Sequence, residues 1–239
     1  MENYYKTTML KIKKGMGSLE GKIAFQFSKK IKLILWINIL FVSCFPSDSP
    51  KTPFYNSADF TAEWIPLSSK KLKEIHKIQP FIFQDQSGSF ISDTLLRGNI
   101  YAVNFFFTTC PSICPKMTNN LIEVQDKIKN LKKVKLVSFS VMPWVDSVEV
   151  LNNYAKKNKI INSKWHLLTG DKNKIYDLAR TSFFAEKRIG LQKKSDEFLH
   201  TENIVLVDYA GRIRGVYNAT LPLELNMMIN DIYELKKEK

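Results

Sequence analysis

The stretch that decides the fold runs from Tyr101 to Leu121 and reads YAVNFFFTTCPSICPKMTNNL. Its first seven residues, Tyr101 to Phe107, are apolar and aromatic except for Asn104, which is the pattern of a strand buried on both faces. Two threonines end this run, and a segment with helical spacing follows. The sequence therefore predicts a buried strand that turns almost directly into a helix.

Two cysteines lie at this turn. Cys110 and Cys114 are each followed by a proline, where the strand gives way to the helix. The backbone N–H groups of a helix start favour negative charge, which lowers the pKa of a thiol and makes it a better nucleophile and metal ligand. The i, i+4 spacing lets both sulfurs meet on one side of the first turn, for a disulfide or for one shared metal ion. The competing interpretation is a pair of ordinary core cysteines.

A histidine farther along the chain extends the set of candidate donors. His200 stands just before Ile204 to Val207, which reads as a buried strand that could lie beside the cysteine strand. Two thiolates and one imidazole are soft donors that select Cu(I) and suit copper in general. On spacing alone, a loop histidine without a ligand role is an equal alternative. The other two histidines, His76 and His166, are interpreted as structural or packed side chains.

The order of the predicted elements indicates an α/β fold. A leading hairpin from Phe81 to Ile91 is followed by alternating strands and helices, and a second hairpin and a last helix complete the pattern. Alternation of this kind implies a mainly parallel sheet covered by helices, and an antiparallel hairpin near the end is the thioredoxin arrangement. We therefore expect a thioredoxin-like fold: a central mixed sheet flanked by helices, with an N-terminal hairpin extension. The expected helices are Cys114 to Asn130, Ser147 to Lys157, Lys172 to Ser182 and Pro222 to Leu235.

The segment FFFTTCPSICPKM, followed much later by a histidine, an LVD strand and a glycine turn, resembles the SCO/SenC proteins. The resemblance runs from about Pro80 to the C-terminus and includes Leu168 to Gly170. Members of that family are thioredoxin-like, membrane-attached copper-binding proteins that help to assemble the CuA centre of cytochrome c oxidase. The resemblance implies copper as the bound metal, with Cys110 and Cys114 as the thiol ligands and His200 as the imidazole ligand.

The resemblance also implies partners, and it has one departure. The implied partners are the cytochrome c oxidase subunit that carries CuA and, beside it, other copper chaperones or thiol reductants. Family members often carry Asp-Pro after the strand that follows the motif helix, whereas this chain has Met142-Pro143. This chain therefore lacks that aspartate, and any role that it has in the family would have to be carried out by Asp146.

The N-terminal residues have the pattern of an export signal. Residues 1–43 contain a lysine-rich stretch and then an apolar run, Leu33 to Val42, which is shorter than the ~20 residues of an ordinary membrane span. The residues FVSC before and at Cys44 resemble a bacterial lipoprotein cleavage box, so we expect a lipidated Cys44. An uncleaved membrane anchor is the alternative. Residues 44–79 are expected to be a tether and packing extension, and residues 80–239 the thioredoxin-like SCO domain.

Charge and cysteine usage agree with an exported, membrane-tethered protein on the periplasmic or extracytoplasmic side. The formal net charge of the 239 residues is +13, without a compact basic face that carries interleaved aromatic residues. We therefore expect no nucleic-acid partner, and an attraction to anionic membrane surfaces instead. With Cys44 lipidated, an even pair of cysteines remains for a compartment in which disulfides form.

Two classes of function fit the cysteine pair. In the first, a metallochaperone holds copper and passes it on by ligand exchange. In the second, an enzyme cycles Cys110 and Cys114 between dithiol and disulfide to reduce a partner. The three residues between the cysteines and the distal His200 favour copper, since thioredoxin-type reductases usually have two intervening residues. A peroxidase-like sensor is disfavoured because Thr108 lies only two residues before Cys110.

Overall fold

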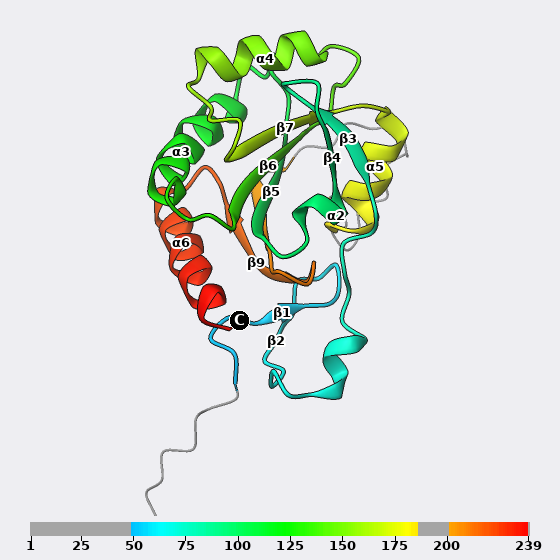
Figure 1. Ribbon diagram of the computed structural model, residues 1–239, viewed down its shortest axis with the longest axis vertical. Coiled ribbons are helices and arrows are strands. Elements are labelled where there is room, and N and C mark those ends of the chain that lie inside the picture. The colour runs from blue at the N-terminus through cyan, green and yellow to red at the C-terminus, as the bar shows by residue number, and fades with distance from the viewer. Residues whose placement is uncertain (1–48, 186–200, 239) are drawn as a thin grey trace, which may run out of the picture. The chain divides into compact units, whose positions relative to one another are not determined.

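The computed structural model describes residues 49–185 and 201–238, and these form a mixed β-sheet flanked by helices (Figure 1). The expected α/β, thioredoxin-like architecture is confirmed. Seven strands lie in the order β4-β3-β7-β6-β5-β8-β9. They are β3 (Ile82–Asp85), β4 (Phe90–Ser92), β5 (Ile100–Phe106), β6 (Val134–Ser140), β7 (Trp165–Thr169), β8 (Asn203–Val207) and β9 (Ile213–Asn218).

The direction in which each pair of strands runs follows from the connection between them. β5, β6 and β7 are parallel neighbours, and each is reached through a helix, as parallel strands require. β8 pairs antiparallel with β5, and β9 pairs antiparallel with β8. The leading hairpin, β3 and β4, adds antiparallel to β7 at the other edge. Every residue of β5 is buried, as the sequence predicts.

Helices cover both faces of this sheet. The described helices are α2 (Asp93–Leu96), α3 (Ile113–Ile128), α4 (Val148–Lys157), α5 (Lys172–Thr181) and α6 (Pro222–Lys237). One hydrophobic core joins the apolar side chains of α3, α4 and α6 to one face of the sheet. A second core joins α2 and α5 to the opposite face. No helix within residues 49–185 or 201–238 has the length and apolar character to cross a membrane.

Local signals set most helix boundaries. Ser147 caps α4 by accepting a hydrogen bond from the Val150 N–H, and Asp171 caps α5 in the same way from the Lys174 N–H. Pro222 opens α6 at its first turn. Sequence reasoning missed the one-turn helix α2 and the small elements before the sheet. These are the 3₁₀ helix η1 (Lys70–Lys73) and the two-residue strands β1 (Phe54–Tyr55) and β2 (Ala62–Glu63), which pair with each other.

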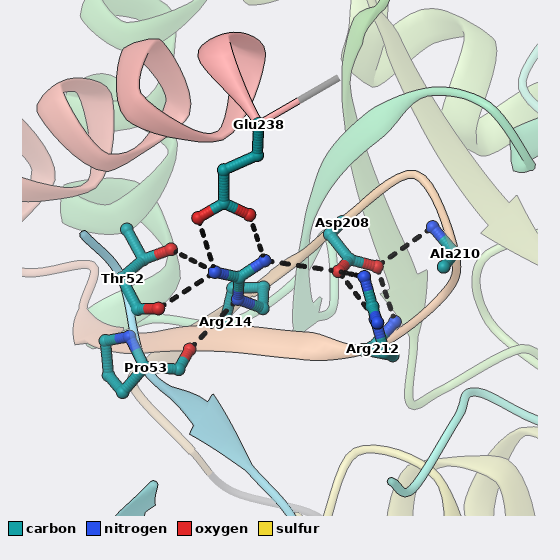
Figure 2. A network of polar contacts seen from close by, with 7 residues as sticks. All are labelled: Thr52, Pro53, Asp208, Ala210, Arg212, Arg214 and Glu238. Atoms are coloured by element: carbon teal, nitrogen blue, oxygen red, sulfur yellow. Dashed lines mark hydrogen bonds and ion pairs between the residues drawn. The ribbon is translucent and has the colours of Figure 1, made fainter. Parts of the chain in front are cut away.

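A buried arginine joins the segment before β1 and the end of α6 to the sheet edge (Figure 2). The Arg214 side chain in β9 is only 1% exposed and lies 4.0 Å from the ring of Phe54, measured from Cζ to the ring centroid. Its Nη1 and Nη2 atoms donate to the two Glu238 carboxylate oxygens at 2.6 and 2.8 Å, and Nη1 also lies 3.3 Å from Asp208 Oδ2. Its remaining donors reach the Thr52 and Pro53 carbonyls at 2.8 and 3.0 Å. All three guanidinium nitrogens are therefore satisfied.

Replacing Arg214 with methionine should lower the free energy of unfolding by about 3 kcal/mol or more, because nearby carboxylates then lose a buried cationic partner. Urea unfolding followed by circular dichroism measures this change. The matched control is Arg97→Met, because the Arg97 side chain is 64% exposed in its pair with Asp93. That exposed pair is worth only about 1 kcal/mol or less. Equal losses in the two variants would contradict a structural role for the Arg214 network.

Candidate metal and redox site

The cysteine pair lies where four neighbouring strands reach one end of the sheet. Phe106 at the end of β5 is level with Ser140 at the end of β6. On the other side, Asn104 pairs with Ile204 near the start of β8, and Asn203 pairs with Asn218 at the end of β9. The loop after β5 carries Cys110, and α3 begins immediately afterwards with Cys114 in its first turn. The carboxyl ends of parallel strands are the usual location of a functional site in folds of this kind.

The two thiols are brought together, as the i, i+4 spacing predicts. Both cysteines are free and buried, with exposed fractions of 7% for Cys110 and 5% for Cys114. Their side chains are hydrogen-bonded to each other. Backbone N–H groups of Ser112, Ile113 and Cys114 also donate to the Cys110 sulfur. The start of α3 therefore supplies the electropositive surroundings that favour a thiolate at Cys110.

The two thiols differ in acidity, which corrects the simple expectation of a lowered pKa for both. Burial opposes ionisation of Cys110, but the hydrogen bonds from three backbone N–H groups and from Cys114 outweigh it and lower the pKa of Cys110. Burial raises the pKa of Cys114 to about 12, assisted by the neighbouring Cys110 and by the negative charge of Asp146. Cys110 is therefore the thiol that ionises first, and Cys114 is the proton donor of the pair.

A buried carboxylate holds the loop in front of Cys110. Asp146, fully buried in the turn after β6, accepts hydrogen bonds from the backbone N–H of Thr108 at 3.2 Å and from its hydroxyl. The hydroxyl of Ser140 donates to the same carboxylate. Sequence reasoning named Asp146 only as a possible substitute for an aspartate missing at Met142. Its contact with Thr108 could have been found from the sheet, because both residues follow the carboxyl ends of adjacent parallel strands.

A tyrosine from α4 contacts the helix that carries Cys114. The Tyr154 hydroxyl is hydrogen-bonded to the Thr118 hydroxyl at 2.8 Å, one helical turn after Cys114. Its ring lies against Phe106, with the centroids 5.7 Å apart. Burial raises the pKa of Tyr154, and the nearby Cys114 and Asp146 act in the same direction. Tyr154 therefore remains a neutral hydroxyl beside the thiols, and the sequence pattern gave no sign of it.

Two of the predicted site residues, His200 and Cys44, lie outside the described residues. The strand that follows His200 does pair with the cysteine strand, since β8 lies antiparallel to β5. Within the described part of the chain, no group of three or more His, Cys, Asp or Glu side chains is arranged to hold a metal ion. The other histidines have structural partners: His166 Nδ1 is 3.0 Å from Asp85 Oδ2, and His76 Nε2 is 2.8 Å from the Ser182 carbonyl.

The described residues fit copper in their chemistry. Two sulfur donors in mutual contact, one of them with a lowered pKa, are what a soft cation such as Cu(I) prefers. The same pair fits redox chemistry, because thiol–disulfide exchange needs one thiolate to attack and a second thiol to resolve. The geometry therefore supports both classes of function.

Comparison with known proteins connects this site to a family. A protein-family model described as SCO1/SenC matches residues 69–236. A solved structure of BsSco, described as a member of the Sco family of cytochrome c oxidase assembly proteins with a disulfide switch, is 30% identical. It superimposes with a TM-score of 0.59 and the match covers 69% of this chain and 95% of that one.

Two further solved structures are similar over the same region. A SCO1/SenC family lipoprotein from Bacillus anthracis is 27% identical with a TM-score of 0.59, covering 67% of this chain and 95% of that one. ScoI from Bradyrhizobium japonicum, solved with copper bound, is 26% identical with a TM-score of 0.51, covering 67% of this chain and 98% of that one.

The acidity difference predicts the order in which the thiols react. Near neutral pH, iodoacetamide should alkylate Cys110 well before Cys114, because only Cys110 has a lowered pKa and the thiolate is the reactive form. The rate at Cys110 should fall as the pH is lowered through that pKa, whereas Cys114 should remain protonated until the pH approaches about 12. Peptide mass spectrometry of quenched samples measures both rates. The two cysteines are similarly buried, so equal rates would mean equal acidity and would contradict the assignment.

Proposed function

Because this chain belongs to the SCO1/SenC family, we propose that it is a membrane-tethered protein that binds copper and delivers it to the CuA subunit of cytochrome c oxidase during assembly. The observation that carries this proposal is the contact between the Cys110 and Cys114 thiols at the start of α3. Copper is the cargo, and His200 is the proposed third ligand. The Sco structure with bound copper and the Sco protein described as an oxidase assembly factor support this assignment.

Each residue of the site has a proposed task in holding and releasing the cargo. Cys110, whose pKa is lowered, offers the first thiolate, and Cys114 loses its proton when a cation replaces that proton. Asp146 keeps the loop before Cys110 in position through Thr108. His200 lies in sequence just before β8, the neighbour of the cysteine strand, which supports its role as the imidazole ligand. Release proceeds by exchange of these ligands for cysteines and histidines of the acceptor.

The alternative function is thiol–disulfide exchange with a partner protein. The pKa difference between the two cysteines favours it, since Cys110 can attack and Cys114 can resolve. The Cys110 thiolate attacks a partner disulfide, forming a mixed disulfide and releasing one partner thiolate. Cys114, on losing its proton, then displaces the second partner thiolate and leaves a Cys110–Cys114 disulfide. Two electrons pass to the partner, which gains one proton from Cys114 and one from solvent, so this activity keeps the acceptor cysteines reduced. Other copper chaperones or thiol reductants would regenerate the dithiol.

Copper titration of the purified, reduced protein should give one equivalent of bound metal. Cys110→Ser and Cys114→Ser should each abolish binding, because each removes a thiolate. His200→Ala should weaken binding and change the visible spectrum of the Cu(II) form, while His166→Ala, the matched control, should retain the wild-type stoichiometry. Oxidation to the Cys110–Cys114 disulfide should also abolish Cu(I) binding. An unchanged copper stoichiometry in the Cys110→Ser, Cys114→Ser double variant would contradict the copper proposal. Thiol exchange would then remain as the alternative.

The attachment to the membrane is proposed to occur through a lipid on Cys44. In this proposal residues 1–43 are a cleaved signal, residues 44–79 are the tether and packing extension, and residues 80–239 are the SCO domain on the extracytoplasmic side. The Bacillus anthracis relative described as a lipoprotein supports this reading. An uncleaved N-terminal anchor is the alternative, and it leaves the domain on the same side of the membrane.

Replacing Cys44 with serine distinguishes these two forms of attachment. If Cys44 carries the lipid, the variant should lose the acyl modification and the processed N-terminus, because the peptidase needs the cysteine. Mass spectrometry of the N-terminal peptide from membrane fractions provides the measurement, and Cys114→Ser is the matched control, which should be processed normally. A wild-type protein that keeps residues 1–43 and carries no lipid would establish the anchor instead.

A further inference from the structure

The thiols are buried deeply enough that a partner has to contact their surroundings. Cys110 and Cys114 are 7% and 5% exposed, so a partner group reaches them only after the partner lies on the surface above them. The strand register gives the surroundings of this surface. The ends of β6 and β9 and the start of β8 lie level with the end of β5. The turn after β6 and the segment after β9 therefore flank the cysteine loop on either side.

The turn after β6 carries an exposed aromatic residue. Trp144 is 58% exposed, and its ring lies 5.2 Å from the Lys172 Nζ atom at the start of α5. The turn itself is well ordered by hydrogen bonds from the Val145 and Asp146 N–H groups to the Met142 carbonyl, at 2.8 and 2.9 Å. Asp146, two residues after Trp144, is bonded to Thr108 of the cysteine loop. Trp144 therefore belongs to an ordered turn that is bonded to the cysteine loop, and its ring, beside Lys172, is largely exposed to solvent.

The segment after β9 carries exposed leucines on the other side. Leu221 is 43% exposed and Leu223 is 74% exposed, at the start of α6. Helical side chains incline toward the N-terminus of their helix, so Leu223 inclines toward the end of the sheet that holds the cysteines. The Asn120 amide of α3 donates to the Ala219 carbonyl at 2.9 Å, which fixes this segment to the helix that carries Cys114.

We propose that Trp144, Leu221 and Leu223 form an apolar docking rim for the acceptor protein that exchanges ligands or electrons with Cys110 and Cys114. This inference rests on the proposed function, because the occupant is the folded acceptor whose cysteines and histidines reach the buried pair. The rim spans three strand spacings, from β6 to β9, which is roughly 14 Å and lies within the width of a single protein–protein contact of ~800 Å². Tryptophan is among the residues that most often anchor such contacts, which favours Trp144 as the main anchor of the rim.

A membrane surface is a poorer occupant than a protein. Thr52 and Pro53, which lie within the proposed tether and packing extension, are bonded to Arg214 near the start of β9. Ile213 is paired with Val207, and Val207 with Tyr101 at the start of β5. The attachment of this segment therefore lies at the opposite end of the sheet from the cysteine loop. A rim at that far end is placed to meet another protein.

The test measures how tightly the full-length protein, purified in detergent, binds the soluble CuA-bearing domain of an oxidase subunit in its reduced, metal-free form. Trp144→Ala and Leu223→Ala should each weaken binding and raise the dissociation constant about tenfold or more. The double variant should show the product of the two effects, because the residues lie on different sides of one contact. The matched control is Phe90→Ala, since Phe90 is 64% exposed but lies on β4 at the far edge of the sheet. It should bind as the wild type does.

Two further readouts separate docking from the chemistry of the site. Copper stoichiometry and the rate of disulfide exchange with glutathione should remain at the wild-type values in every rim variant, because a metal ion and a small thiol do not need the rim. If the rim variants bind the CuA domain as tightly as the wild type, or lose affinity only as much as Phe90→Ala, the rim is not a docking surface. If the wild type does not bind the domain at all, the docking proposal also fails, whereas the copper titration decides the copper-binding function independently.

Discussion

The structure depends on the complete burial of β5 between β6 and β8. A strand that is buried on both faces has to satisfy its backbone groups through its two neighbours, because no water reaches them. The parallel register with β6 and the antiparallel register with β8 meet this requirement along most of the strand. The same registers bring the turn that holds Asp146 and the start of β8 level with the cysteine loop. The backbone pairing of β5 therefore brings the cysteine loop, the Asp146 turn and the start of β8 to one end of the sheet.

The buried charges at the two ends of this sheet have different partners. At one end Arg214 is surrounded by carboxylates, carbonyls and the face of Phe54, so its charge is fully compensated. At the other end Asp146 is fully buried and is bonded to hydroxyl and backbone donors of Thr108 and Ser140. The negative charge of Asp146 contributes to the raised pKa of Cys114. This end therefore carries a negative field that disfavours a second anion at Cys114 and favours any cation that approaches the thiols.

The sequence predicted the parts of the site that depend on local patterns. The apolar run of β5, the caps Ser147 and Asp171, and the spacing of Cys110 and Cys114 each act within a few residues, so their structural consequences could be worked out in advance. Asp146, Tyr154 and Arg214 could not be assigned in this way. Their partners lie far away in the chain, and only the strand order shows that a carboxylate after β6 reaches a threonine after β5. The lowered pKa of Cys110 agrees with the helix-start argument, whereas the raised pKa of Cys114 depends on burial, which that argument does not include.

The opposite acidities of the two cysteines are compatible with both proposed functions, copper binding and disulfide exchange. A pair with two low pKa values would carry two negative charges in a buried position beside Asp146, and like charges at such distances are costly. A pair with one low and one high pKa holds a single negative charge and a single proton. A bound Cu(I) ion can take the place of that proton, and a partner sulfur can bond to the thiolate while the proton remains available on Cys114. Both proposed reactions would therefore begin from the same singly ionised pair, which the electrostatics of the buried loop favour.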